Sequence, residues 1–295
     1  MTKPVVDARA TTCVGDLVEH IAHELGAHNV DQPAAEARDL IAALYDEPRF
    51  WPIANASATV DDDHRSRALN ALRLRLLGAP LAYAVGRAAF RTLTLSVDER
   101  VLIPRPETER LVDLVLENAS QFAGGVAIDV CTGSGAIALA LAAEGPFARV
   151  YATDVSRDAL AVARENVELS AGMLRAPIDL IEGSLLAPLS HVRAHVVVSN
   201  PPYIAFGEAT DLPASVRDWE PAVALYSGAD GLSATARLVR EAGDVLEAGG
   251  LLAIEVDMRR ASLVAELVSR EQRFHNIRVE LDLTGRDRFV LATKR

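Results

Sequence analysis

The segment 200–203, Asn-Pro-Pro-Tyr, combines residue types suited to binding a planar amide or amino group. It follows the β-branched run 195–199, which is typical of a buried strand in a parallel sheet. Proline lacks a backbone N–H and fixes φ, so Pro201 and Pro202 end this strand and hold the Asn200 amide in place. Open α/β sheets bind ligands at the carboxyl ends of their strands, where Asn200 and Tyr203 are therefore expected. The alternative is a strand-ending turn with a packed tyrosine.

A second candidate site lies at 131–135, Cys-Thr-Gly-Ser-Gly, between a strand pattern and a helix pattern. Glycine lets a ligand approach the backbone closely, but the turn lacks the third glycine of a dinucleotide fingerprint and a phosphate-binding lysine. Asp154 ends the next predicted strand, about twenty residues later, where an acid accepts hydrogen bonds from ribose hydroxyls. Together the turn and Asp154 predict a nucleoside-containing cofactor.

The elements that would position these residues form a doubly wound α/β domain. Apolar runs predict strands at 126–130, 149–153, 178–181, 195–199, 251–256, 277–281 and 289–292. Helical periodicity predicts helices from 106, 136 and 156, and over 231–248 and 261–269. The loop after the third strand would lie beside the base of a nucleoside, with Ser184 as a polar contact and Leu185 as an apolar one. The long irregular segment from Tyr203 to Tyr226 is typical of a lid or binding loop.

The N-terminal part of the chain, from about 14 to 78, has a helical pattern. A first helix ends at Gly26, a second begins at Pro33, and a third follows the acidic run 61–63. Leucines are expected to form the apolar side of the third helix: Leu69, Leu72, Leu76 and Leu77. These helices predict a small bundle with little core of its own. The alternating segment 90–98 predicts a half-exposed strand that pairs with 101–103 in a hairpin.

Composition narrows the class of protein. The chain has 295 residues, is 50% hydrophobic and carries a net charge of −11, which does not favour binding to a nucleic acid backbone. Cys13 and Cys131 form no disulfide or metal pattern, and His20, His23 and His28 do not match a zinc motif, so we expect no metal. The start of the chain has no signal-peptide core and no run reaches the length of a membrane span. We therefore expect a cytoplasmic protein with no membrane association.

The chain resembles the glutamine-N5 methyltransferases of peptide chain release factors, the HemK family. The resemblance covers nearly the whole chain and rests on six segments of the sequence: 80–86, 102–109, 129–141, 200–203, 220–225 and 285–288. Asn-Pro-Pro-Tyr is shared with amino-directed DNA methyltransferases. Pro-Arg-Pro-Glu-Thr-Glu at 104–109 and the helical N-terminal part make the resemblance specific.

The resemblance implies a Rossmann-like, seven-stranded methyltransferase domain that uses S-adenosyl-L-methionine. The expected domains are 1–85, a helical domain that recognises the release factor, 86–103, a β-hairpin linker, and 104–295, the methyltransferase domain. The substrate would be the glutamine of the Gly-Gly-Gln loop, with Asn200 and Tyr203 as catalytic residues. Asn200, Pro201, Pro202 and Tyr203 would bind this glutamine. Cofactor contacts would fall on Cys131, Thr132, Gly133, Ser134, Gly135, Asp154, Ser184, Leu185 and Asn200.

Three positions depart from the family pattern. Cys131 and Asp257 stand where glycine is common, and Ser184 stands where an acid commonly faces the adenine. They motivate a competing hypothesis, a non-catalytic paralogue that binds a partner. A glutamine methyltransferase of a ribosomal protein is a second competing hypothesis, which the segment 104–109 argues against. A DNA adenine methyltransferase is a third, disfavoured by the acidic charge and by the absence of an obvious target-recognition domain.

Overall fold

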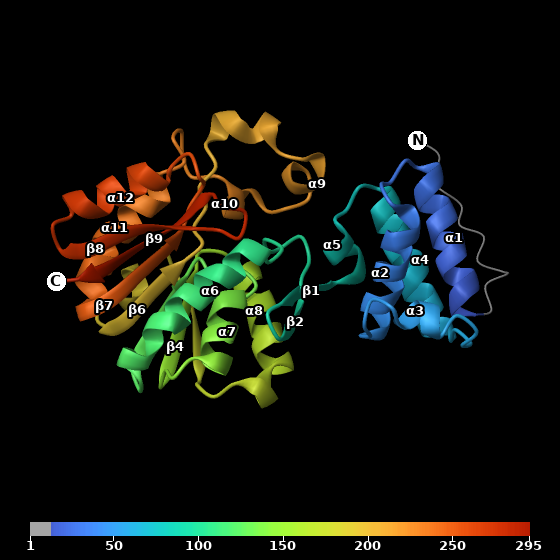
Figure 1. The fold of residues 1–295 in the computed structure, drawn as a ribbon, viewed down its shortest axis with the longest axis horizontal. Helices are drawn as coiled ribbons and strands as arrows, with labels where there is room; N and C mark the ends of the chain where they lie inside the picture. The colour runs from blue at the N-terminus through green and yellow to red at the C-terminus, as the bar shows by residue number, and fades with distance from the viewer. Residues whose placement is uncertain (1–12) are drawn as a thin grey trace. The chain divides into compact units, whose positions relative to one another are not determined.

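The computed structural model describes residues 13–295 and divides into two compact units (Figure 1). The smaller unit ends at Arg87 and also takes in Ala214–Trp219. The larger unit consists of Ala88–Pro213 and Glu220–Arg295. The first residues of the chain, where we expect no signal peptide, lie outside the described residues.

Helices make up the smaller unit. They are α1 (Val14–Ala27), α2 (Pro33–Tyr45), α3 (Trp51–Ala54), α4 (Asp62–Leu76) and α5 (Leu81–Val85), with α9 (Ala214–Arg217) from later in the chain. Pro33 begins α2 as predicted, and the Oδ1 of Asp61 caps α4 by accepting a 2.8 Å hydrogen bond from the N–H of His64. The core is formed by α1, α2 and α4, including Leu17, Ile21 and Leu40.

The predicted apolar side of α4 is wrong in part. Leu72 is buried as expected, but Leu77 is 56% exposed, and the other buried side chains of α4 are those of Ala68 and Ala71. Ala68 and Ala71, three residues apart, lie on the same face of α4. Because their side chains are small, this face can pack closely against neighbouring helices without a row of leucines.

The β-hairpin also differs from the prediction. Its strands are β1 (Arg87–Phe90) and β2 (Leu93–Ser96), so the turn falls inside the predicted strand 90–98, and 101–103 is not a strand. Arg91 has a φ of 54°, and its backbone N–H donates to the Oε1 of Glu109 at 3.0 Å. Its guanidinium binds Asp113 and Glu144, at 2.6 and 2.8 Å. These ion pairs fix the turn at Arg91.

A seven-stranded sheet forms the centre of the larger unit, in the order β5-β4-β3-β6-β7-β9-β8. The strands are β3 (Val126–Val130), β4 (Arg149–Asp154), β5 (Ile178–Glu182), β6 (Ala194–Ser199), β7 (Leu246–Glu255), β8 (Phe274–Leu281) and β9 (Asp287–Lys294). The first five are parallel, and β9 runs antiparallel to both β7 and β8. The predicted fold class is confirmed.

Helices cover both faces of this sheet (Figure 1). On one face, α6 (Pro106–Ala119) and α7 (Ala136–Glu144) pack with the hairpin against Val196 and Val198, and α8 (Arg157–Leu169) packs against β4 and β5. On the other face, α11 (Ser233–Val245) and α12 (Ala261–Arg270) pack against Val197. Alternate residues of β6 thus enter two separate cores, as expected of a strand covered on both sides.

Short elements complete the larger unit. They are α10 (Ala222–Leu225) and the 3-10 turns η1 (Ser120–Phe122), η2 (Ala171–Met173), η3 (Ala187–Leu189) and η4 (Phe206–Asp211). The predicted boundary between helix 231–248 and strand 251–256 is wrong, because α11 ends at Val245 and β7 begins at Leu246. Leu246 already pairs with Ala194, and a register shift follows before Leu251 pairs with Val196. The bulge absorbs Gly249 and Gly250 into β7.

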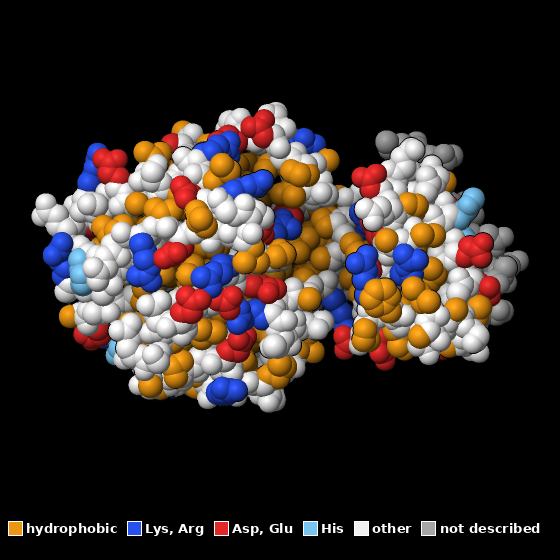
Figure 2. All heavy atoms as spheres, viewed as in Figure 1, with side chains coloured by type: hydrophobic (Ala, Val, Ile, Leu, Met, Phe, Trp, Pro, Cys, Tyr) orange, Lys and Arg blue, Asp and Glu red, His pale blue; other side chains and the backbone are white. Residues whose placement is uncertain are grey.

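Charged side chains of both signs are interspersed on the face drawn in Figure 2. Among the helices between residues 13 and 295, none has the length and apolar character needed to cross a lipid bilayer.

Candidate functional site

A cavity of about 440 Å³ lies at the carboxyl ends of the parallel strands of the larger unit. It is lined by Cys131 after β3, Asp154 at the end of β4, Ser184 after β5 and Asn200 after β6. Because β4 and β6 flank β3 on opposite sides, the cavity occupies the point where the strand order reverses, the usual ligand site of an open α/β sheet. Residues from the later part of the chain close it, among them Pro221, Val223, Ala224, Tyr226, Ser233, Ala234 and Arg237.

Asp154 is held by backbone donors at both of its carboxylate oxygens. Its Oδ2 accepts a 2.9 Å hydrogen bond from the N–H of Gly133, and its Oδ1 accepts one of 2.9 Å from the N–H of Ser156. Burial raises the pKa of the Asp154 carboxyl, while these hydrogen bonds oppose the rise. Gly133 has a φ of 55°, and an added Cβ would meet no atom within 4 Å. The turn therefore leaves open space beside an oriented carboxylate.

The buried Asp129 is hydrogen-bonded to the glycine turn and to the start of α7. The Oδ2 of Asp129 accepts hydrogen bonds from the Thr132 hydroxyl at 2.6 Å and from the N–H of Ala138 at 3.1 Å. Burial raises the pKa of Asp129 to about 7, and its Oδ1 has no hydrogen-bond partner among the described residues. Thr132 thus holds the turn and does not line the cavity.

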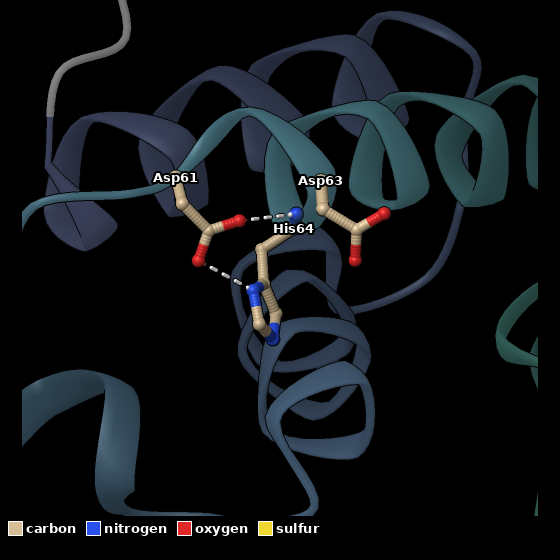
Figure 3. Close-up of side chains that lie close together, drawn as sticks. All are labelled: Asp61, Asp63 and His64. Atoms are coloured by element: carbon tan, nitrogen blue, oxygen red, sulfur yellow. Dashed lines mark hydrogen bonds and ion pairs between the residues drawn. The ribbon is translucent and has the colours of Figure 1, made fainter.

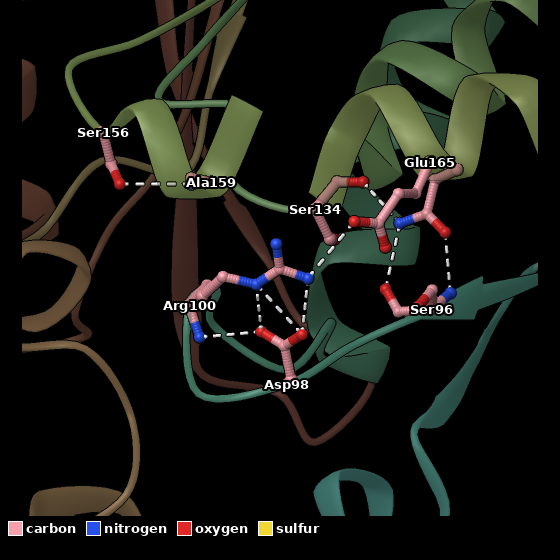
Figure 4. Close-up of polar contacts among 8 residues, drawn as sticks. Ser96, Asp98, Arg100, Ser134, Ser156, Ala159 and Glu165 are labelled. Atoms are coloured by element: carbon pink, nitrogen blue, oxygen red, sulfur yellow. Dashed lines mark hydrogen bonds and ion pairs between the residues drawn. The ribbon is translucent and has the colours of Figure 1, made fainter. Parts of the chain in front are cut away.

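Asn166 of α8 ties the same turn to the hairpin. Its Nδ2 donates to the carbonyls of Ser134 and Ser96, at 2.9 and 3.0 Å, and its Oδ1 accepts from the N–H of Ser96 at 2.6 Å. Arg100 lines the cavity, and its guanidinium forms an ion pair with Asp98 (Figure 4). The Nη2 of Arg100 is 2.6 Å from the Oδ2 of Asp98. The sequence did not single out Asn166, because its partners lie far away in the chain.

An arginine stands beside Ser184. The Nη1 of Arg237 donates to the Ser184 Oγ at 3.1 Å, and its Nε donates to Glu241 at 2.5 Å. The other carboxylate oxygen of Glu241 accepts from the N–H of Leu186 at 2.9 Å. Leu185 lies between them with a φ of 51° and lines the cavity. Arg237, which sequence reasoning missed, therefore donates to the side chain that was predicted as a polar contact.

Asn200 leaves β6 at the start of the two prolines and makes a hydrogen bond to α6. Its Nδ2 donates to the Oγ1 of Thr108 at 3.2 Å, and that hydroxyl donates to the Oε2 of Glu255 at 2.7 Å. Glu255 is 1% exposed, and burial raises its pKa to about 7. Burial also raises the pKa of Tyr203, and the charge of Glu255 adds to the rise. Neither Thr108 nor Glu255 was singled out from the sequence, since the two lie 147 residues apart.

Arg105, between two prolines ahead of α6, forms an ion pair with Glu220. The Glu220 side chain is 1% exposed, and burial raises its pKa although Arg105 opposes the rise. The pair joins the segments 104–109 and 220–225, both of which carry the resemblance. Arg105 is therefore held by a buried partner.

Of the residues predicted for the site, those that line the cavity are Cys131, Gly133, Asp154, Ser184, Leu185, Asn200 and Pro202. Five others do not line it: Thr132, Ser134, Gly135, Pro201 and Tyr203. An added Cβ on Gly135 would meet Ala163 and Leu139 at 3.4 Å, so this glycine serves the packing of α7 against α8. The ligand roles predicted for the site residues remain predictions.

One carboxylate–histidine cluster is found in the described part of the chain, at Asp61, Asp63 and His64 (Figure 3). Asp61 accepts hydrogen bonds from both the backbone and the ring of His64, so helix capping accounts for this arrangement. Of the histidines expected on the surface, His23 and His28 are exposed, while His20 is half-buried.

Comparisons with known proteins find two matching families. The family described as PrmC N-terminal domain matches residues 16–86, and the family described as Methyltransferase small domain matches residues 108–215. Among solved structures, a methyltransferase from Pyrococcus furiosus is 18% identical with a TM-score of 0.52, covering 79% of this chain and 98% of its own. The hMettl16 catalytic domain is 17% identical with a TM-score of 0.53, covering 79% and 82%. These similarities show the fold alone.

Curated relatives are similar over nearly the whole chain. The release factor glutamine methyltransferase of Moorella thermoacetica is 40% identical over 92% of this chain and 95% of its own. That of Deinococcus radiodurans is 38% identical over 95% and 98%, and that of Mycolicibacterium smegmatis is 42% identical over 73% and 75%. With these identities over both units, the chain belongs to the release factor glutamine methyltransferase family.

Proposed function

We propose that this protein transfers a methyl group from S-adenosyl-L-methionine to the side-chain amide nitrogen of the glutamine in the Gly-Gly-Gln loop of peptide chain release factors. The observation that carries the proposal is the position of Asn200 and Asp154 on the walls of one cavity. One is an amide suited to an amide substrate, and the other is a carboxylate suited to a ribose. The names of the relatives support the same substrate.

The residues around the cavity fit S-adenosyl-L-methionine. Asp154 offers an oriented carboxylate to ribose hydroxyls, and the space beside Gly133 admits a ligand against the backbone. Ser184 and Leu185, with Arg237, would lie beside the adenine. When bound, the cofactor supplies an electrophilic methyl group on a positively charged sulfur. Cys131, Thr132, Ser134 and Gly135 complete the turn that would hold it.

The glutamine amide would be held by acceptors at the end of β6. An amide nitrogen is a poor nucleophile, because its lone pair is delocalised into the carbonyl. In the proposed mechanism the Asn200 Oδ1 and the Pro202 carbonyl accept hydrogen bonds from its two N–H groups, and Tyr203 packs against the glutamine side chain. Such acceptors orient the nitrogen and increase its electron density, so no strong general base is needed before transfer. Pro201 and Pro202 keep the acceptors in place.

Both units would take part in binding the protein substrate. We assign recognition of the release factor to the helical part, 1–85, joined by 86–103 to the methyltransferase domain, 104–295. A translation factor as substrate implies a cytoplasmic location. The relatives' names favour release factors over a ribosomal protein. The oriented Asp154 carboxylate favours catalysis over a partner-binding paralogue.

A transfer assay tests the proposal. The full chain is incubated with labelled S-adenosyl-L-methionine and a purified release factor, either wild type or with the loop glutamine replaced by alanine. Label on the wild-type factor alone supports the proposal, and no label on either overturns it. Asn200→Ala should abolish transfer and retain most cofactor binding by calorimetry, whereas Asn118→Ala on α6 serves as a matched control. Unchanged turnover in Asn200→Ala would remove the role assigned to Asn200.

A further inference from the structure

We propose that Thr108 and Glu255 are positioning residues that set which end of the Asn200 amide faces the substrate. The inference rests on the proposed function, in which Asn200 accepts a hydrogen bond from the glutamine amide. Neither residue needs to touch the substrate. Their task is to keep the Asn200 oxygen, and not its NH₂ group, directed at the incoming amide.

Three elements distant in sequence meet at this point. Asn200 follows β6, Thr108 lies in the first turn of α6, and Glu255 is the last residue of β7. The Thr108 Oγ1 is 3.2 Å from the Nδ2 of Asn200 and 2.7 Å from the Oε2 of Glu255. Thr108 is 5% exposed and Glu255 is 1% exposed, so water has little access to compete for these groups.

The direction of the hydrogen bonds follows from the donors available. In its ionised form the Glu255 carboxylate can only accept, so the single hydrogen of the Thr108 hydroxyl then goes to Glu255. Thr108 can then only accept from Asn200, which selects the amide rotamer with Nδ2 toward α6. The Oδ1 of Asn200 is left on the opposite side of the amide. Rotation of the amide by half a turn would put oxygen against hydroxyl oxygen and present a donor to the glutamine NH₂.

Charged groups from several elements act on Glu255. Burial raises its pKa, and the Thr108 hydrogen bond opposes this rise most strongly. Arg288 of β9 and Arg105 ahead of α6 also favour the ionised form, and Glu107 of α6 opposes it. The charge of Glu255 also acts on Tyr203: burial raises the pKa of the Tyr203 hydroxyl, and the charge of Glu255 adds to the rise. The Thr108 hydrogen bond and the two arginines thus act against burial, which has the largest effect on the pKa of Glu255.

Substitution of Thr108 separates positioning from packing. Thr108→Val keeps the shape and removes the hydroxyl, whereas Thr108→Ser keeps the hydroxyl. We expect kcat for methyl transfer to fall about 10- to 100-fold in Thr108→Val, the scale of losing a supporting hydrogen bond behind a reacting group. Thr108→Ser should stay within about threefold of wild type. Thr94→Val, on the exposed side of β2, is the control for the same chemical change.

Binding measurements complete the test. Calorimetric Kd values for S-adenosyl-L-methionine should be nearly the same in wild type and Thr108→Val, since Thr108 does not line the cavity. Glu255→Gln should also lower kcat, because its amide can donate to Thr108 and reverse the chain of hydrogen bonds. If the wild-type protein is active and Thr108→Val has the same kcat, the positioning role is overturned. A wild-type protein that fails to methylate the release factor overturns the proposed function instead.

Discussion

The backbone N–H of Gly133 donates a 2.9 Å hydrogen bond to the carboxylate of Asp154. This contact joins the turn after β3 to the end of β4, and both residues line the cavity. With the N–H of Ser156 bound to the other oxygen, the carboxylate has a donor at each of its two oxygens.

Asp154→Asn should therefore weaken cofactor binding strongly. The NH₂ group of the new amide must face the backbone N–H of either Gly133 or Ser156. In both orientations a donor faces a donor, so the side chain will rotate away from the ribose position. We expect the Kd for S-adenosyl-L-methionine to rise at least about tenfold, equivalent to about 1.4 kcal/mol. Calorimetry measures this, with Asp158→Asn on the exposed start of α8 as control. Equal Kd values for the two variants would contradict the assignment.

Gly133→Ala should affect binding more than folding. Gly133 and Gly124 both have positive φ, of 55° and 75°, and an added Cβ would meet no atom within 4 Å at either position. The backbone penalty, about 1–2 kcal/mol, is therefore common to both alanine variants. Only Gly133 lines the cavity, so only Gly133→Ala should raise the Kd for S-adenosyl-L-methionine. If Gly124→Ala weakened binding equally, backbone strain alone would account for the loss.

The ion pair between Arg105 and Glu220 allows a double-mutant test. Arg105→Met leaves the buried Glu220 carboxylate without its partner, a change that costs about 3–5 kcal/mol at fully buried pairs and less here, since Arg105 is partly exposed. The double variant with Glu220→Gln should recover part of the lost thermal stability. Arg157→Met, from an exposed pair with Glu182, should change stability by about 1 kcal/mol at most. Scanning calorimetry measures the melting temperatures of the wild type, Arg105→Met, the double variant and Arg157→Met. No recovery of the melting temperature in the double variant would refute the coupling between Arg105 and Glu220.

Stability should fall as the pH rises toward neutrality. The pKa of Asp129 is raised from 3.8 to about 7 by burial, so between these values the folded protein binds more protons than the unfolded chain. The unfolding free energy therefore decreases with rising pH over this interval, and Glu255 contributes with the same sign. Asp129→Asn retains an oxygen for Thr132 and Ala138 and has no proton to lose. Urea denaturation from about pH 5 to about pH 8 should show a smaller decrease in Asp129→Asn than in wild type. Identical slopes would contradict the prediction.

The sequence predicted the sheet and one side of the site because their signals are local. A valine run followed by two prolines specifies where β6 ends, and Asp154 is recognisable by its place directly after a strand. Thr108, Asn166 and Glu255 carry no comparable local signal, since their partners lie far along the chain. Thr108 and Glu255, for example, are 147 residues apart.

The misplaced hairpin has the same origin. Alternation from 90 to 98 is a period-two pattern, which says nothing of a turn inside it. The turn at Arg91 depends on ion pairs with Asp113 of α6 and Glu144 of α7, which exist only after these helices have docked. Similarly, β7 extends back to Leu246 because that residue pairs with Ala194.

The pairing of β3 with β6 has a consequence for the geometry of transfer. Val130 lies opposite Ser199 in the parallel ladder, so the next residues, Cys131 and Asn200, leave the sheet from neighbouring positions. Cys131 belongs to the turn that would hold the methyl donor, and Asn200 would hold the nitrogen that accepts the methyl group. The backbone positions of these two residues are thus spaced by the strand separation, about 4.8 Å, and not by any side chain. A substitution that leaves the β3–β6 pairing intact leaves this spacing unchanged. A register slip of one residue would change it, and would also turn the valines of β6 toward the wrong cores.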